Sequence, residues 1–185
     1  MPERRPGPET QLAFDFSAKP ESSPPEQIVR AGLLANFDSR ESGLGRFIRS
    51  VDHDVQIQTP ALAANFLMQQ IFTPFDDFTQ EELVALMLNT KNRITHTALI
   101  YRGTINAIFV RNAEVFRPAI LANARSIMLA HNHPSSDPTP SPEDVRLTQS
   151  CAEAGRILDV ELMDHIIVGR DQWVSLKERR LGFDP

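Results

Sequence analysis

The sequence predicts a mixed α/β domain whose sheet is covered by helices. Short apolar runs of strand length alternate with helix-forming stretches, an order typical of helices packed on a sheet. The chain has 185 residues, of which 41% are hydrophobic and 23% charged, enough for one ordinary domain with a core. Six of the 14 prolines lie in the first 25 residues, a composition typical of disordered segments.

These observations divide the chain into three parts. Residues 1–26 are expected to form a flexible, disordered proline-rich tail, and residues 27–58 a short helical region of unassigned role. The ordered domain is expected to span residues 60–183. Within the tail, residues 11–16 loosely resemble peptides that bind bacterial sliding clamps. Weak clamp docking is therefore one expectation, and packing on the chain's own domain is the alternative.

Local signals predict the elements of the domain. A hydroxyl N-cap at Thr59 precedes proline at the first helical position, and this helix is expected to run to about Phe72. Gly155 is expected to end the last helix, and Gly169 to open a turn. The other expected elements are strands at residues 83–88, 97–101, 105–110, 126–130 and 160–168, and helices at residues 113–124 and 142–154.

Composition argues against several classes of protein. The first 50 residues hold equal numbers of basic and acidic side chains, so the net charge of -5 falls on the ordered part. Strong direct binding to nucleic acid is not expected, because such a domain has no broad basic face. No apolar run approaches the roughly 18 residues of a membrane helix. With a single cysteine and no apolar leader, the chain is expected to be cytoplasmic.

The segment 130–144 carries the strongest chemical signal. His131 and His133 lie two residues apart at the end of a predicted strand, so both imidazoles could reach one ion. Pro134 ends the strand, and Asp144 falls in the first turn of the next helix. Two imidazoles and one carboxylate with an open fourth position are the ligand pattern of catalytic zinc.

Ser141 and Asp144 also have a simpler interpretation. Ser141 fits a helix N-cap, with Pro142 at the first helical position and Asp144 as the capping-box partner. That interpretation needs no metal, but it leaves two histidines at the end of a buried strand without partners. We favour a metal site and keep the cap as the alternative.

The pattern His-x-His-Pro-(x6)-Ser-x-x-Asp resembles the JAMM motif of MPN-domain metalloproteins, and His-Asn-His-Pro-Ser resembles its bacterial RadC-like branch. The resemblance covers roughly residues 60–183, and it departs at Ser136, where the branch usually has glycine. It implies an MPN (cytidine-deaminase-like) fold, with a mixed sheet flanked by helices. It also implies a zinc-dependent metallohydrolase, with His131, His133 and Asp144 as the Zn²⁺ ligands and a peptide or isopeptide bond of a protein as the substrate.

The resemblance further implies two catalytic residues. Ser141 would donate a hydrogen bond to the oxyanion, and an upstream glutamate would act as general base. Counting back from the end of the first predicted strand places this base at Glu81. Glu82 is the alternative, on the opposite face of the strand, and Glu114, at a predicted helix start, is a third candidate.

Two alternative functions remain open, and three further residue roles are expected. The chain could be a non-catalytic interaction module that holds zinc, or an accessory protein of DNA repair, the label customary for the branch. Asp137 is expected to form a turn, and Cys151 to be buried. Asp164 and His165 are expected to form a structural hydrogen-bonded pair, with support of the metal ligands as the alternative.

Overall fold

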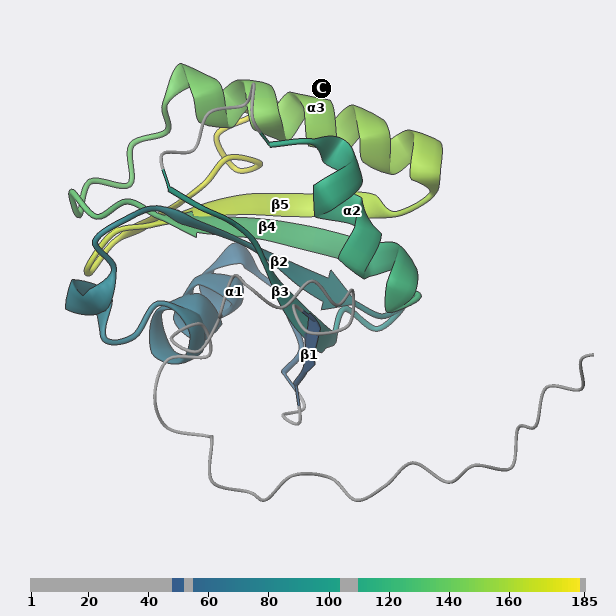
Figure 1. The fold of residues 1–185 in the computed structure, drawn as a ribbon, viewed down its shortest axis with the longest axis horizontal. Coiled ribbons are helices and arrows are strands. Elements are labelled where there is room, and N and C mark those ends of the chain that lie inside the picture. Colours follow the sequence, from purple (N-terminus) through teal and green to yellow (C-terminus); the bar gives the residue numbers. More distant parts are fainter. Residues whose placement is uncertain (1–47, 52–54, 104–109, 184–185) are drawn as a thin grey trace, which may run out of the picture.

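A six-stranded mixed sheet forms the middle layer of the fold in the computed structural model, which describes residues 48–51, 55–103 and 110–183 (Figure 1). The strands are β1 (Ile48–Ser50), β2 (Glu82–Leu88), β3 (Ile94–Arg102), β4 (Ser126–Asn132), β5 (Glu161–Val168) and β6 (Trp173–Ser175). Their order is β1-β3-β2-β4-β5-β6. Only β4 and β5 are parallel among these neighbours. The mixed α/β class predicted from the sequence is therefore confirmed.

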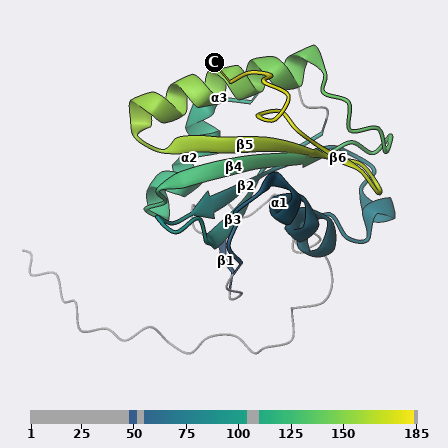
Figure 2. The ribbon, with the colours of Figure 1, turned by 180° about the vertical axis from the view of Figure 1, so that it is seen from behind.

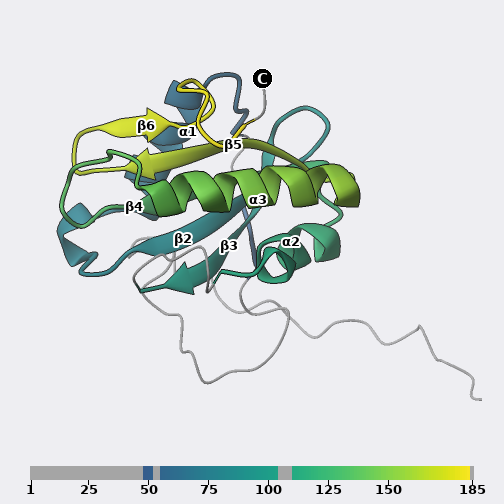
Figure 3. The ribbon, with the colours of Figure 1, turned by 90° about the horizontal axis from the view of Figure 1, so that it is seen from above.

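Helices cover both faces of this sheet (Figures 1 and 2). On one face lies α1 (Pro60–Phe66), which a π-helical turn continues over Leu67–Ile71. On the other face lie α2 (Asn112–Leu121) and α3 (Pro142–Leu158). Seen from above, α3 lies over the side of the sheet that holds β5, and α2 over the side of β2 and β3 (Figure 3). Each face of the sheet therefore carries its own hydrophobic core.

Strands β2 and β4 are buried along their whole length. They lie in the middle of the sheet between the two cores, so neither face of these strands meets water. This explains why both appear in the sequence as continuous apolar runs rather than as alternating patterns. No helix among the described residues is both long enough and apolar enough to cross a bilayer.

The start of α1 agrees with the prediction. The Thr59 hydroxyl accepts a hydrogen bond from the Leu62 backbone N–H, and Pro60 occupies the first helical position. The helix continues almost to Phe72, as expected, but its last turn is π-helical. A 3-10 turn at Phe75–Asp77 then leads toward β2.

The predicted end of the last helix is wrong. Helix α3 continues through Gly155 to Leu158, and its C-cap is Asp159, which adopts a left-handed φ of 55°. Gly155 serves close packing instead, because a Cβ at this position would lie 2.6 Å from the Val160 carbonyl oxygen. Strand β4 also runs beyond its predicted end, so His131 lies inside the strand.

Several sequence expectations concern the N-terminal part and one loop. Residues 1–47, which include the proline-rich tail and the 11–16 segment, lie outside the described residues, as does all but Val110 of the strand predicted at 105–110. Within the predicted helical region 27–58, the described residues hold strand β1 and no helix. Pairing of β1 with the edge of β3 satisfies backbone groups that would otherwise face solvent on both strands.

Candidate metal centre

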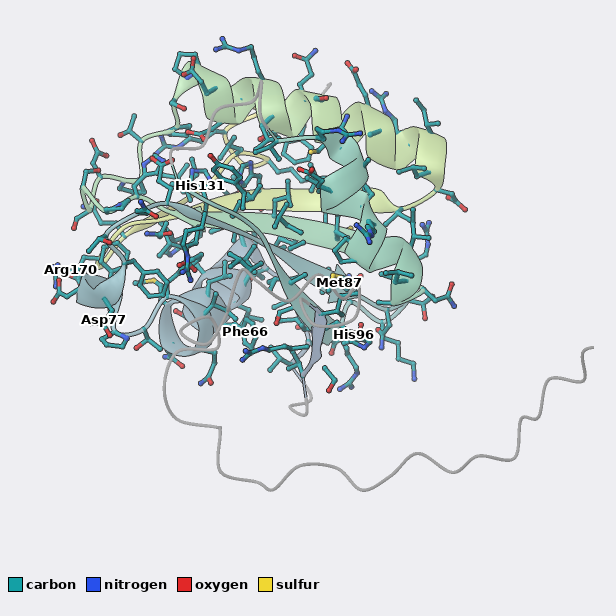
Figure 4. All side chains as sticks on the ribbon, viewed as in Figure 1. Phe66, Asp77, Met87, His96, His131 and Arg170 are labelled. Atoms are coloured by element: carbon teal, nitrogen blue, oxygen red, sulfur yellow. The ribbon has the colours of Figure 1, made fainter. Side chains whose placement is uncertain are left out.

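His131, His133 and Asp144 come together at one end of the sheet. His131 is buried near the end of β4, His133 follows the strand, and Asp144 lies in the first turn of α3. Figure 4 shows His131 beneath the start of α3, at the end of the sheet away from His96. The connection from a strand end through a loop to a helix start thus places the three predicted ligands in one group.

The distances in this group suit one small divalent ion. The His131 Nε2 atom lies 3.0 Å from His133 Nε2 and 3.2 Å from Asp144 Oδ1, and His133 Nε2 lies 3.7 Å from Asp144 Oδ2. Two ligand atoms of a tetrahedral zinc ion are separated by about 3.3 Å. Two imidazole nitrogens and one carboxylate oxygen are also donors that zinc prefers. The group could therefore hold a metal ion, and the donors do not distinguish zinc from other first-row metals.

Asp144 is both a member of this group and part of a helix cap. Its Oδ2 accepts hydrogen bonds from the backbone N–H and the hydroxyl of Ser141, at 2.7 and 2.6 Å, while Oδ1 faces His131. The Ser141 hydroxyl accepts the Asp144 N–H in return, which completes the predicted capping box. The two interpretations of the sequence are thus compatible, because Oδ2 serves the cap while Oδ1 faces His131.

The charges of the group favour an ionised carboxylate. Burial would raise the pKa of Asp144, but hydrogen bonds with His131, His133 and Ser141 hold that pKa far below its ordinary range. Burial would also lower the pKa of His133, but Asp144, the Asp137 carbonyl and the charge of Glu81 together raise it. At neutral pH the group therefore offers a carboxylate anion next to two imidazoles.

The loop after β4 is fixed by contacts with β5 and the turn that follows it. The His133 N–H donates to the Val168 carbonyl at 2.9 Å. A Cβ on Gly169 would lie 2.3 Å from the Ser136 carbonyl oxygen, so only glycine permits this approach. Ser136 itself adopts a left-handed φ of 68°, which glycine would adopt without strain. Asp137 accepts hydrogen bonds from Thr139 N–H and hydroxyl, as expected of a turn residue.

The two adjacent glutamates have different surroundings. Glu82 is buried at the start of β2, where its carboxylate pairs with Arg102 at 2.7 Å. Its Oε2 has no hydrogen-bond partner among the described residues. Burial raises the pKa of Glu82, and the Arg102 guanidinium only partly offsets this effect. Glu81, in contrast, lies near enough to His133 for its charge to raise the pKa of that imidazole.

Glu81 borders a cavity next to the candidate metal centre. The cavity has a volume of about 340 Å³, and its lining residues are Thr79, Gln80, Glu81, Gly103 and Pro134. The Glu81 carbonyl accepts the Gly103 N–H at 2.9 Å. Pro134 directly follows His133, but the cavity is not lined by His131, His133 or Asp144 themselves. Glu114, the third candidate, is exposed in the first turn of α2.

Asn132 is a residue of the site that the sequence did not single out. Its side chain is fully buried; Oδ1 accepts the Glu82 N–H at 2.8 Å, and Nδ2 donates to the Gln80 carbonyl at 3.1 Å. One amide thus holds the backbone on both sides of Glu81. The only signal in the sequence is a polar residue between two histidines at the end of an apolar run.

Replacing Asn132 with alanine is expected to lower the free energy of unfolding by about 1–3 kcal/mol, because the buried Glu82 N–H and the partly buried Gln80 carbonyl lose their partner. Urea unfolding of the metal-free protein would measure this loss. Asn112→Ala is the control, since the Asn112 side chain bonds Ser150 at the surface. Equal losses for the two variants would contradict the role given to Asn132.

Asp164 and His165 are hydrogen-bonded, as predicted, but the bond joins the Asp164 carboxylate to the His165 backbone N–H, at 2.7 Å, and not the two side chains. Asp164 accepts hydrogen bonds from the His165 N–H, the Ser175 hydroxyl and the Lys177 N–H. The His165 ring instead contacts His131, with 2.9 Å between Nε2 and the His131 Nδ1. Adjacent strand residues point to opposite faces, which separates the two side chains. Cys151 is buried, as expected, and burial raises the pKa of its thiol to about 12.

Comparisons with known proteins agree with this architecture. A family model described as the RadC-like JAB domain matches residues 57–181. A UPF0758 protein of Roseiflexus castenholzii is 45% identical over 143 residues, which are 77% of this chain and 60% of that protein. A UPF0758 protein of Geobacillus sp. (strain WCH70) is 42% identical over 153 residues, which are 83% of this chain and 62% of that protein. The chain spans about 60% of the length of the curated relatives it matches.

Proposed function

The chain belongs to the RadC-like JAB domain family, and from this premise we propose that it is a zinc-dependent hydrolase of peptide or isopeptide bonds. The observation that carries the proposal is the convergence of two imidazoles and an ionised carboxylate, with a further glutamate, Glu81, whose charge acts on His133. A purely structural zinc site would be closed by a fourth protein ligand. Among the described residues, the group of candidate ligands has three members.

His131, His133 and Asp144 would hold the ion in this proposal. When bound, Zn²⁺ polarises a carbonyl oxygen and lowers the pKa of a water toward about 7. Glu81 borders the cavity and takes the proton from the attacking water. The same carboxyl group then returns this proton to the departing amine.

Ser141 donates a hydrogen bond to the oxyanion of the tetrahedral intermediate in this mechanism. Its hydroxyl donates to Asp144 Oδ2 in the structure, so the hydroxyl hydrogen must turn away from the carboxylate to do so. The Ser141 backbone N–H also donates to Oδ2 and keeps that oxygen partnered during the turn. The helix cap thereby keeps Asp144 oriented while the hydroxyl serves the reaction.

We expect the full chain, loaded with Zn²⁺ and freed of excess metal, to cleave members of a panel of fluorogenic peptides and lysine-linked isopeptides. Removal of the metal with a chelator should reduce cleavage to background, because the ion supplies both the polarisation of the carbonyl and the lowered pKa of the attacking water. Adding Zn²⁺ back should restore it. A chain that binds one zinc ion and cleaves no substrate of the panel would instead favour the non-catalytic interaction module.

A further inference from the structure

A buried series of hydrogen bonds connects His131 with the first turn of α3. His131 Nδ1 lies 2.9 Å from His165 Nε2, and His165 Nδ1 lies 2.6 Å from the Thr148 hydroxyl oxygen. That hydroxyl donates to the Asp144 carbonyl at 2.6 Å. The two histidines and Thr148 are fully buried, and Asp144 is almost so. The series therefore operates away from water, where each hydrogen must have a definite acceptor.

The last acceptor fixes the direction of every bond in this series. A carbonyl oxygen can only accept, so the single Thr148 hydroxyl hydrogen points to Asp144. The Thr148 oxygen must then accept a hydrogen from His165 Nδ1. The reverse direction would bring two acceptor oxygens within 2.6 Å of each other with no hydrogen between them.

The direction of these bonds also determines which nitrogen of His131 carries a hydrogen. A neutral imidazole that carries its hydrogen on Nδ1 has an unprotonated Nε2. His165 Nε2 is therefore an acceptor, and the His131 hydrogen lies on Nδ1. With Nδ1 occupied as a donor, His131 Nε2 is the nitrogen left for the metal group, and it faces Asp144 and His133. In the metal-free chain a proton on Nε2 can be donated to Asp144, and a bound ion would take the place of that proton.

A single hydrogen bond to a backbone carbonyl holds His133 in the same tautomer. Its Nδ1 lies 2.7 Å from the Asp137 carbonyl oxygen, so the hydrogen of the neutral ring sits on Nδ1. His131 has no such loop carbonyl beside it, because it lies within β4 and pairs with both β2 and β5. His165 and Thr148 supply the missing connection to a backbone carbonyl.

We propose that His165 and Thr148 are positioning residues that hold His131 in the tautomer whose Nε2 binds the metal. The inference rests on the metal site of the proposed function, but it does not depend on hydrolysis. Groups that orient a histidine ligand in this way commonly contribute 10–100-fold to metal affinity. Neither residue would touch the ion or the substrate.

Two substitutions at Thr148 separate hydrogen bonding from packing. Thr148→Val keeps the shape of the side chain and removes the hydroxyl, whereas Thr148→Ser keeps the hydroxyl and removes a methyl group. We expect Thr148→Val to weaken Zn²⁺ binding by about 10–100-fold and Thr148→Ser to stay within about threefold of the parent. Competition with a chromophoric chelator measures both affinities. Equal affinities for the two variants, or a weaker Thr148→Ser, would overturn the proposal.

The tautomers can also be observed directly in the parent chain. Nitrogen-15 NMR of the histidine rings should show hydrogen on Nδ1 and an unprotonated Nε2 for His165, in both the metal-free and the zinc-loaded protein. This result is expected whether or not the chain hydrolyses any substrate. Hydrogen on Nε2 of His165 would overturn the proposal even if the metal site and the hydrolase activity are both confirmed.

Discussion

Replacing either His131 or Asp144 with alanine is expected to lower the affinity for Zn²⁺ by about 100-fold or more. Groups that only support a ligand already contribute about 10–100-fold, so loss of a ligand itself must cost at least that much. Each variant leaves two of the three donors in the group. Elemental analysis after removal of excess metal should find about one zinc ion per parent chain and little in either variant.

The Asp144 variant needs a control, because Asp144 also completes the cap of α3. Asp144→Asn keeps an oxygen that can accept the Ser141 N–H, but a neutral amide is a poor zinc ligand. It should therefore lose zinc while the helix cap is largely preserved, and thermal unfolding of the metal-free protein would check the cap. Glu143→Gln, on the neighbouring residue of the same first turn, should retain zinc. If the parent itself binds no zinc, Asp144 is only a capping residue.

The sequence predicted the central elements of the fold because burial on both faces leaves a strong local pattern. β2 and β4 are continuous apolar runs, and Thr59 with Pro60 marks a helix start. The end of α3 could not be read in the same way. Glycine is typical of a helix end, but Gly155 lies inside α3. It is glycine there because a Cβ would collide with the carbonyl oxygen of Val160, which follows the helix.

The metal group could also be predicted, since its members lie within 14 residues of one another and each has a local signal. The residues around it could not. Asn132 contacts the backbone at the start of β2 across 50 positions of sequence, and His165 contacts His131 across 34. Such contacts depend on which strands become neighbours, and a single sequence does not state that order. The contact of the His165 ring with His131, and not with Asp164, has the same origin.

The two adjacent glutamates could be predicted from the sequence only in part. Strand alternation predicts opposite faces for Glu81 and Glu82, but not which face meets the histidines. In the structure, Glu82 is buried against Arg102, and the charge of Glu81 reaches His133. The family resemblance already favours Glu81, and the pairing of Glu82 with Arg102 of β3 supports that choice. This geometry supports Glu81 as the proposed general base.

Glu81→Gln is accordingly expected to lower kcat for any substrate that the chain hydrolyses by about 10²–10⁴-fold, the usual contribution of a general base. The amide keeps the shape of the side chain but cannot accept a proton from water. Because Glu81 is not a member of the metal group, zinc content and affinity should stay close to those of the parent. Paired measurements of kcat and of bound zinc separate loss of the base from loss of the metal.

Glu82→Gln is the matched control, since it makes the same change one residue along the chain. Burial raises the pKa of Glu82, so the folded protein disfavours its charged form, and a neutral amide at this position should not lower stability at neutral pH. The sign follows because a raised carboxyl pKa lowers the stability of the parent as the pH rises above the ordinary value of this group. The variant should therefore gain stability relative to the parent at neutral pH and lose that advantage in acid, while kcat changes little. A large loss of kcat in Glu82→Gln, with Glu81→Gln near the parent, would assign the base to the other face of β2 and contradict the geometry described above.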